Sequence, residues 1–110
     1  MATTPLDLYR MGNASNARMD HVRPDRDVTV IERDGVAWVE GRSGGVSTFS
    51  QVGEQASNWW RLPAGSRYDD GLLVVWNDHG DHWSWEPARD MTLDDYRAAL
   101  LEINAQFVRV

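Results

Sequence analysis

Hydrophobic and polar positions along this chain form short runs that have the two-residue period of β-strands. Apolar or alternating runs bounded by glycine, proline, asparagine or aspartate lie at residues 6–9, 28–31, 36–39, 59–62, 72–76 and 82–85. Runs of this length between turn-forming residues predict strands. Asp34 and Gly35 separate the second run from the third, and an Asp-Gly pair accepts the positive φ angles that tight hairpin turns require. We therefore expect mixed, mostly antiparallel β-sheets.

The remaining segments before the C-terminus are predicted as follows. The run at residues 72–76 is almost continuously apolar, which is typical of a central strand buried on both faces. Residues 82–85 alternate polar and aromatic side chains, and the short turn at 78–81 predicts that they pair with 72–76 as a second hairpin. Residues 47–55 favour a short helix with a hydroxyl or asparagine cap, but the pattern is too short to decide. Residues 11–27 are polar and rich in turn formers, so we expect a loop or broken helix.

The last element has the pattern of an amphipathic helix. Thr92 can cap its start, with Asp95 three residues further on. Asp94 and Asp95 then lie in the first turn, where the helix dipole favours negative charge. Apolar side chains recur at helical spacing at Leu93, Tyr96, Leu100, Ile103 and Phe107. Several short strands and one C-terminal helix that packs on them predict an α+β fold. We expect a single small domain over residues 1–110.

Composition fits one small folded domain. The chain has 110 residues, of which 42% are hydrophobic, and it contains six tryptophans, which excludes an intrinsically disordered protein. No apolar run approaches the roughly 20 residues that a membrane-spanning helix needs.

The absence of cysteine excludes disulfides, thiolate metal sites and thiol catalysis. Residues 1–5 lack the basic and hydrophobic stretches of a signal peptide. We therefore expect no signal peptide, and a protein that stays in the cytoplasm of its producer unless a dedicated machine exports it.

The charge balance restricts the partners of the chain. The net charge is -6 and the pI is about 4.8, which opposes general binding to the phosphate backbone of nucleic acids. All eleven cationic side chains are arginines. An anion bound here would therefore be held by planar guanidinium groups.

The glycine pair followed by two hydroxyl residues at 44–49 is the main candidate for a binding segment. Gly44 and Gly45 permit a close approach of the backbone to a ligand. Ser47 and Thr48 add adjacent hydroxyl groups, so the segment suits a small polar molecule. A plain loop for the glycines and helix capping for the hydroxyls are alternative interpretations. Arg10, at the end of the first predicted strand, has the alternative of an ordinary surface ion pair.

Residues 78–82 carry histidines and aspartates that suit a divalent metal ion. His79 and Asp81 fall in the predicted turn, and alternate residues of a strand point to opposite faces. The pattern therefore does not predict converging ligands, and we predict no metal site. His82 is a better candidate for lining a binding site.

Five short motifs occur in a fixed order between about residues 6 and 103. They are Leu-Tyr-Arg at 8–10, Gly-Gly-Val-Ser-Thr-Phe at 44–49, Trp-Arg-Leu-Pro-Ala-Gly at 60–65, Gly-Leu at 71–72, and His-Trp-Ser-Trp-Glu-Pro-Ala-Arg-Asp-Met at 82–91. Together they resemble the small cytotoxic effectors of bacterial type VI secretion whose fold is similar to ADP-ribosyltransferases. The resemblance implies an antibacterial toxin that acts on an unidentified target in the recipient-cell cytoplasm. It also implies that a cognate immunity protein neutralises the toxin in the producing cell.

The same resemblance implies an NAD site. The wider superfamily uses an arginine, a Ser-Thr-Ser-like segment and a glutamate, which implies that Arg10, Ser47 and Glu86 are the catalytic residues here. Glu86 would stabilise the cationic ribosyl group, and Arg10 would bind the pyrophosphate or adjoining ribose. Ser47 would maintain the geometry of the site by hydrogen bonding. Phe49, Trp83 or Trp85 would stack on the nicotinamide ring. The implied NAD contacts are Arg10, Gly45, Ser47, Thr48, Phe49, His82, Trp83 and Trp85.

Two departures from the superfamily pattern affect the interpretation. Phe49 stands where a second serine is expected. Ser84 stands where arginine-modifying enzymes have glutamate or glutamine, and this second departure disfavours arginine as the acceptor. A toxin of the same fold that only binds a macromolecule, and an adaptor module of a secretion system, therefore stay open. The sequence predicts core positions for Trp59, Trp60 and Trp76, because burying an aromatic side chain stabilises a small domain by roughly 2 to 3 kcal/mol.

Overall fold

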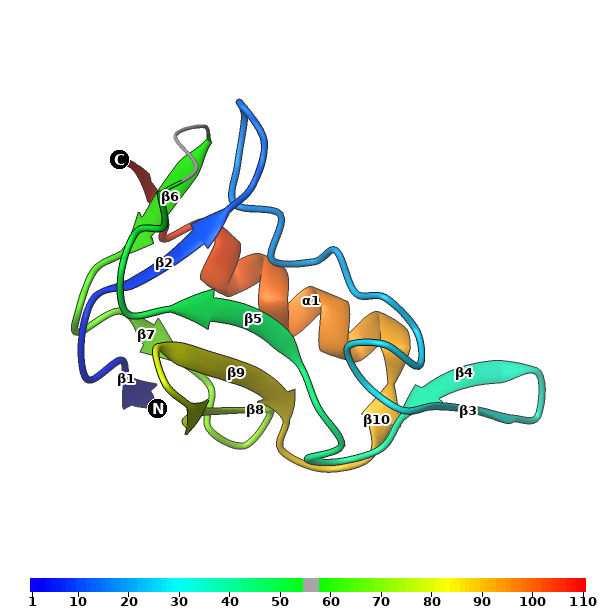
Figure 1. Cartoon of the computed structure of the whole chain (residues 1–110). Coiled ribbons are helices and arrows are strands. Elements are labelled where there is room, and N and C mark those ends of the chain that lie inside the picture. Colours follow the sequence, from blue (N-terminus) through cyan, green and yellow to red (C-terminus); the bar gives the residue numbers. More distant parts are fainter. Residues whose placement is uncertain (55–57) are drawn as a thin grey trace.

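The largest element of the fold is a six-stranded antiparallel sheet. A computed structural model of the chain describes residues 1–54 and 58–110. The strand order is β11-β6-β2-β5-β9-β8 (Figure 1), and every neighbouring pair is antiparallel. The strands are β2 (Leu8–Met11), β5 (Val46–Phe49), β6 (Trp59–Leu62), β8 (Leu73–His79), β9 (His82–Pro87) and β11 (Val108–Arg109).

The remaining strands of the described residues form two smaller sheets. One has the order β10-β4-β3, with β3 at Val30–Arg33, β4 at Val36–Val39 and β10 at Met91–Thr92. The other pairs β1 (Ala2–Thr3) with β7 (Arg67–Tyr68). The hairpin of β3 and β4 projects from the body of the molecule (Figure 1). Its turn has φ angles of 52° at Asp34 and 77° at Gly35, so the predicted Asp-Gly hairpin is confirmed.

Helix α1 (Leu93–Asn104) covers one face of the six-stranded sheet (Figure 1). The predicted cap is confirmed, because the Asp95 amide donates to Thr92 Oγ1 at 3.1 Å. The buried side of the helix packs with side chains of the sheet in one hydrophobic core. That side consists of Leu93, Tyr96, Ala99, Leu100 and Ile103. The predicted α+β fold, mostly antiparallel with a C-terminal helix, is therefore confirmed.

The structure corrects two predictions about individual segments. Strand β8 pairs with β9 but lies at the edge of the sheet, and Trp76 is 47% exposed, so this strand is neither central nor buried on both faces. The fully buried tryptophan is Trp85. Residues 46–49 form β5, and residues 50–54 are not helical; Gln55, the end of the predicted short helix, lies outside the described residues. No helix among the described residues is long and apolar enough to span a membrane.

Candidate active site

Alternation along β5, β9 and β8 divides their side chains between the core and an outer face. Thr48 and Trp85 are completely buried on the core side. Ser47 pairs with Ser84 across β5 and β9. Trp76 of β8 pairs with Ser84 from the other side. Because paired residues of adjacent antiparallel strands share a face, Ser47, Ser84 and Trp76 form a row on the outer face of the sheet.

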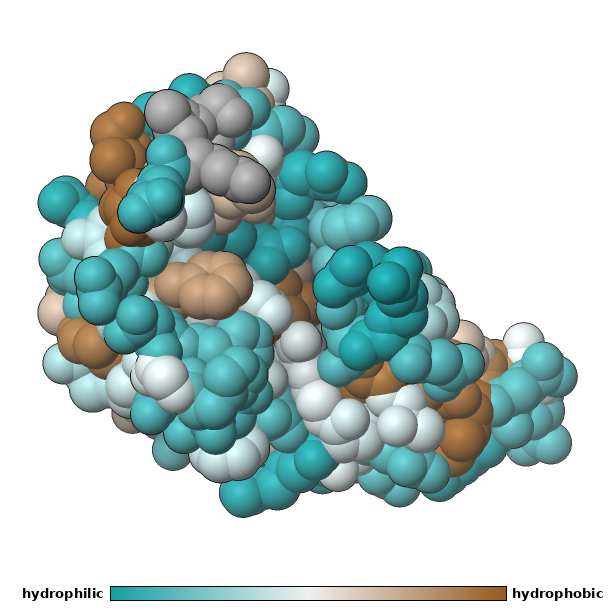
Figure 2. Space-filling model, viewed as in Figure 1, coloured by the Kyte–Doolittle hydropathy of each residue, from teal (hydrophilic) through white to brown (hydrophobic). Residues whose placement is uncertain are grey.

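This outer face carries two hollows that meet at one carboxylate. The first has a volume of about 280 Å³. Its lining residues are Arg23, Arg26, Asp27, Gly44, Gly45, Ser47, Asp78, His82, Ser84 and Glu86. The second has a volume of about 300 Å³ and is lined by Arg42, Val74, Trp76 and Glu86. The view in Figure 2 shows that this side of the molecule is largely hydrophilic.

Ser47, His82 and Asp78 form a chain of hydrogen bonds in the first hollow. Ser47 Oγ lies 2.7 Å from His82 Nε2, and His82 Nδ1 forms a very short contact with Asp78 Oδ1. Partial burial alone raises the pKa of Asp78, but the hydrogen bond and charge of His82, with a smaller effect of His79, lower that pKa below its ordinary value. Asp78 is therefore an ionised acceptor at neutral pH.

A β-bulge places Asp78 against His82. The register of β8 on β9 shifts between Asn77 and His79, and such bulges redirect side chains. His79 Nδ1 also lies 3.1 Å from Asp78 Oδ1, and its ring stacks on that of His82 at 4.8 Å. One potential metal-ligating atom of each of these three residues lies within 4.8 Å of the others. The sequence pattern did not predict this convergence, because the alternation of a regular strand is interrupted here by the bulge.

Glu86 lies at the junction of the two hollows and is held in place by two donors. The side chain is on the outer face of β9, and the residue is only 5% exposed. The Trp76 indole donates to its Oε2 at 2.6 Å, and the Gly44 amide donates to its Oε1 at 3.3 Å. Carboxylate oxygens accept both hydrogen bonds. The site therefore presents a fixed carboxylate between two cavities.

Comparison with known protein families yields a match over most of the chain. A model of the family described as Tse2 ADP-ribosyltransferase toxin matches residues 6–109. The chain belongs to this family. The match confirms the resemblance seen in the sequence motifs and shows a toxin of the ADP-ribosyltransferase type. No curated protein matches the chain.

Within this Tse2-family fold, Arg10 lies outside both hollows. It shares a face of β2 with the buried Leu8, because alternate strand residues point the same way. Its guanidinium donates to the carbonyl of Ala17 at 2.8 Å, to that of Ser47 at 2.7 Å and to that of Arg18 at 3.0 Å. Burial lowers the pKa of Arg10 to about 10, so it remains charged at neutral pH. In this structure the side chain holds the backbone behind Ser47, and its implied role in binding pyrophosphate stays a prediction.

Three other residues implied as NAD contacts in the Tse2-family chain lie toward the core. Thr48 Oγ1 donates to the Trp83 carbonyl at 2.9 Å and accepts from the Trp85 indole at 3.1 Å. Trp83 is partly buried and packs against the same core. Alternation along the strands directs Thr48, Trp83 and Trp85 away from the first hollow, and their implied contact with NAD stays a prediction. Phe49 borders a different hollow, beside Trp59.

The glycine pair has a structural role in this Tse2-family site. A Cβ atom on Gly45 would lie 1.9 Å from the Trp85 carbonyl oxygen, and one on Gly44 would lie 2.3 Å from that of Asp27. Gly44 also has a φ of 126°, which favours glycine. The pair therefore lets β5 begin close to β9 and to the loop that carries Asp27. Both glycines line the first hollow.

The sequence pattern did not indicate Arg23 and Arg26 as residues of the Tse2-family site, and it offered Asp78 only as a possible metal ligand. Arg23 forms an ion pair with Asp27 at 2.8 Å. Arg26 lines the first hollow, is exposed, and forms no ion pair within residues 1–54 and 58–110. Both arginines lie in the Arg-Pro-Asp-Arg segment at 23–26, whose pattern predicts only a loop or broken helix. No local pattern indicates that this loop borders Ser47.

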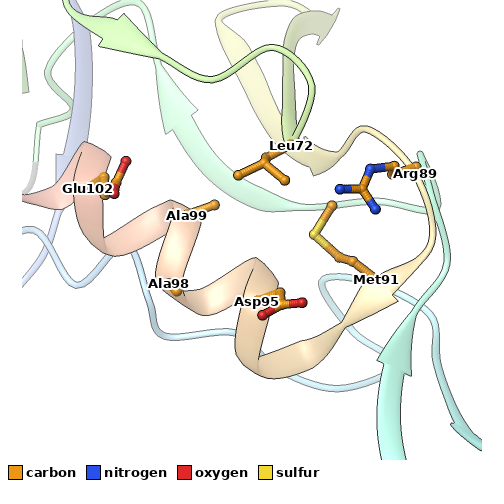
Figure 3. A pocket seen from close by; sticks show the side chains of 7 residues that line it. All are labelled: Leu72, Arg89, Met91, Asp95, Ala98, Ala99 and Glu102. Atoms are coloured by element: carbon orange, nitrogen blue, oxygen red, sulfur yellow. The ribbon is translucent and has the colours of Figure 1, made fainter.

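A further hollow of about 280 Å³ lies beside α1 and shares no lining residue with the first two (Figure 3). Leu72, Met91 and Ala99 form its apolar part, and Arg89 points toward it (Figure 3). Its remaining lining residues are Asp95, Ala98 and Glu102. Its lining within the described part of the chain therefore includes no serine or histidine of the kind found beside Glu86.

Proposed function

We propose that this chain is an NAD-dependent ADP-ribosyltransferase toxin that breaks the bond between nicotinamide and ribose. The observation that carries the proposal is the separation of charge within one hollow. Glu86 and Asp78 supply carboxylates from the sheet, whereas Arg23 and Arg26 supply guanidinium groups from the loop. NAD pairs a cationic nicotinamide ring with an anionic pyrophosphate. The carboxylates suit the first part. The guanidinium of Arg26, which forms no ion pair with any residue that the structure describes, suits the second.

The position of Glu86 supports this chemistry. Cleavage of the nicotinamide bond passes through an oxocarbenium-like state, whose positive charge a fixed carboxylate stabilises. The Trp76 and Gly44 hydrogen bonds fix Glu86, so little reorganisation is needed when charge develops. The exposed Trp76 ring beside it offers a flat aromatic face to the nicotinamide cation. In this proposal, Trp76 takes the stacking role that the resemblance implied for Phe49, Trp83 or Trp85.

The size of the site is compatible with a dinucleotide. Ligand pockets typically have volumes of about 300 to 1,000 Å³, and the two hollows of about 280 and 300 Å³ share Glu86. In the proposed arrangement, the nicotinamide occupies the Trp76 hollow, and the ribose and pyrophosphate extend past Ser47 toward Arg26. Ser84 in place of a second glutamate disfavours arginine as the acceptor.

The biological part of the proposal follows from the toxin family. We propose that a type VI secretion machine delivers the chain into the cytoplasm of a recipient bacterium. There it transfers ADP-ribose from NAD to an unidentified target molecule. A cognate immunity protein neutralises it in the producing cell. The match to a toxin family supports this proposal.

Nicotinamide release tests the proposed reaction. The purified chain is incubated with NAD labelled in the nicotinamide ring, with and without bacterial lysate, and released nicotinamide is separated and counted. We expect release by the unmodified chain and a loss of at least about 100-fold in Glu86→Gln, because electrostatic stabilisation contributes about that factor or more. Glu32→Gln is the matched control, since Glu32 is an exposed residue of the β3 strand. Absence of release by the unmodified chain would refute the proposal.

The alternative function is a toxin of the same fold that only binds a macromolecule. The arrangement of Arg10 favours it, because three backbone carbonyls already occupy the arginine that the superfamily directs at NAD. Expression in a bacterium without an immunity protein separates these functions. The enzyme predicts growth arrest that Glu86→Gln relieves. The binding toxin predicts equal arrest by both forms without NAD loss, and an adaptor module predicts no arrest.

A further inference from the structure

Ser47, His82 and Asp78 have the arrangement of a nucleophile, a base and a group that orients the base. The ionised Asp78 can only accept a hydrogen bond, so His82 Nδ1 carries the proton in their contact. His82 Nε2 is then the acceptor for the Ser47 hydroxyl at 2.7 Å. This tautomer is assigned from the hydrogen-bond network. It is the arrangement in which an imidazole removes a proton from a serine.

The surroundings fix the imidazole in this orientation. The His82 side chain is 18% exposed. Phe49 approaches its ring edge-on at 5.5 Å, and the His79 ring stacks on it at 4.8 Å with an interplanar angle of 19°. The bulge in β8 directs Asp78 to the remaining ring nitrogen. A base held on three sides keeps its lone pair directed at Ser47, which is the preorganisation that catalysis requires.

The charged groups that line the hollow indicate which kind of electrophile Ser47 could attack there. A serine that attacks a carbonyl generates an oxyanion, which needs hydrogen-bond donors or positive charge nearby. The sheet side of this hollow instead carries the carboxylates of Glu86 and Asp78. These groups repel an oxyanion and stabilise a cation. The C1′ atom of the nicotinamide riboside in NAD becomes cationic as the glycosidic bond breaks, so it fits this hollow better than an ester or amide.

We propose that Ser47 is a nucleophile, activated by His82 and Asp78, that carries the ADP-ribosyl group covalently before its transfer. This inference rests on the proposed NAD-dependent function. The bond from Ser47 Oγ to C1′ forms as the bond from C1′ to the nicotinamide nitrogen breaks. Nicotinamide leaves as the neutral molecule with the electron pair of that bond. The hydroxyl proton moves to His82 Nε2, and Asp78 stabilises the resulting imidazolium.

The second step regenerates the serine. An acceptor hydroxyl or water attacks C1′ as its bond to Ser47 Oγ breaks. His82 returns its proton to Ser47 Oγ, and the proton of the acceptor is released to water. Each displacement inverts the configuration at C1′, so two displacements retain the β configuration of NAD. A direct single displacement would give the α product.

The experiment uses the full chain with NAD and measures three quantities in the same samples. Nicotinamide release reports cleavage of the glycosidic bond. Mass spectrometry of acid-quenched protein and its peptides reports an ADP-ribose adduct and its position. Nuclear magnetic resonance of the product formed with methanol as the acceptor reports the configuration at C1′. We expect nicotinamide release, an adduct on the peptide that contains Ser47, and a methyl product of β configuration.

Variants test the assigned roles. Ser47→Ala removes the adduct. His82→Gln and Asp78→Asn slow nicotinamide release by about 100- to 10,000-fold, as expected for loss of general base catalysis. Ser15→Ala, at an exposed loop serine, is the matched control and leaves all three readouts unchanged. The adduct and the configuration are measured on the unmodified chain, so they do not depend on the folding of any variant.

The outcomes separate this inference from the proposed function. Nicotinamide release without an adduct on Ser47 at any quench time overturns the nucleophile and leaves the NAD-dependent function intact. A methyl product of α configuration does the same. No nicotinamide release by the unmodified chain overturns both proposals.

Discussion

Replacing Arg10 by methionine is expected to destabilise the fold, because the side chain ties together three backbone segments. The bonds to the Ala17 and Ser47 carbonyls are partly buried, and the bond to Arg18 is exposed. A hydrogen bond from a charged group stabilises a protein by about 1.5 to 3 kcal/mol. Counting only the two partly buried bonds gives a loss of about 3 to 6 kcal/mol. This is a large part of the roughly 5 to 15 kcal/mol that stabilises a typical domain.

Thermal and urea unfolding measure this loss. Each 1 kcal/mol lowers the melting temperature of a domain near this size by about 4 to 8 °C, so Arg10→Met is expected to melt at least about 12 °C below the unmodified chain. Arg10→Lys keeps the charge but cannot bond all three carbonyls in the same way, and it should fall between the two. Arg67→Met replaces an arginine in an exposed position, and is expected to change stability by less than about 0.5 kcal/mol.

One result would refute this reasoning. If Arg10→Met unfolds within about 1 kcal/mol of the unmodified chain and loses NAD binding, measured by calorimetry, then Arg10 contacts the ligand. The carbonyl contacts would then not describe its role in the folded protein.

Three further predictions concern residues around the site. Asp78→Asn is expected to lower the free energy of unfolding at pH 7, measured by urea titration. The difference from the unmodified chain should shrink below about pH 4. The reason is that a carboxyl whose folded pKa lies below its ordinary value of 3.8 stabilises the fold only while it is ionised. Tyr96→Phe leaves the Trp85 carbonyl without its donor at 2.5 Å and the Val46 amide without its acceptor at 3.3 Å. We expect the free energy of unfolding in urea to fall by about 1 to 3 kcal/mol. A fall of less than about 0.5 kcal/mol would contradict this prediction. Gly45→Ala forces the backbone of β5 away from β9, so circular dichroism should show loss of the native fold at 37 °C. A native spectrum with an unchanged melting temperature would disprove the close approach of the two strands.

The sequence predicted the elements that depend on neighbouring residues. The β3–β4 hairpin follows from Asp34 and Gly35, whose positive φ angles are a local property of the turn. The start of α1 follows from the Thr92 cap and the apolar stripe that recurs behind it. The resemblance placed Ser47 and Glu86 in one site, and both side chains line the same hollow.

The features that sequence reasoning missed depend on pairing between distant strands. The apolar run of β8 is compatible with a central or an edge strand, and only its neighbours in the sheet decide between them. The face on which Arg10 lies is set by the register of β2, in which a shift of one residue reverses every side chain. Asp78 reaches His82 through a bulge, which a pattern with a strict period of two cannot predict.

The edge position of β8 also has a consequence for how the protein loses activity. Trp76 and Asp78, which hold Glu86 and His82, are carried by a strand with a neighbour on only one side. An edge strand can open with a smaller free energy than the whole domain. Separation of β8 from β9 would release both supports while the helix and the buried Trp85 stay packed. Inactivation should therefore precede global unfolding, and slow hydrogen exchange in α1 should persist in protein that has already lost its toxicity.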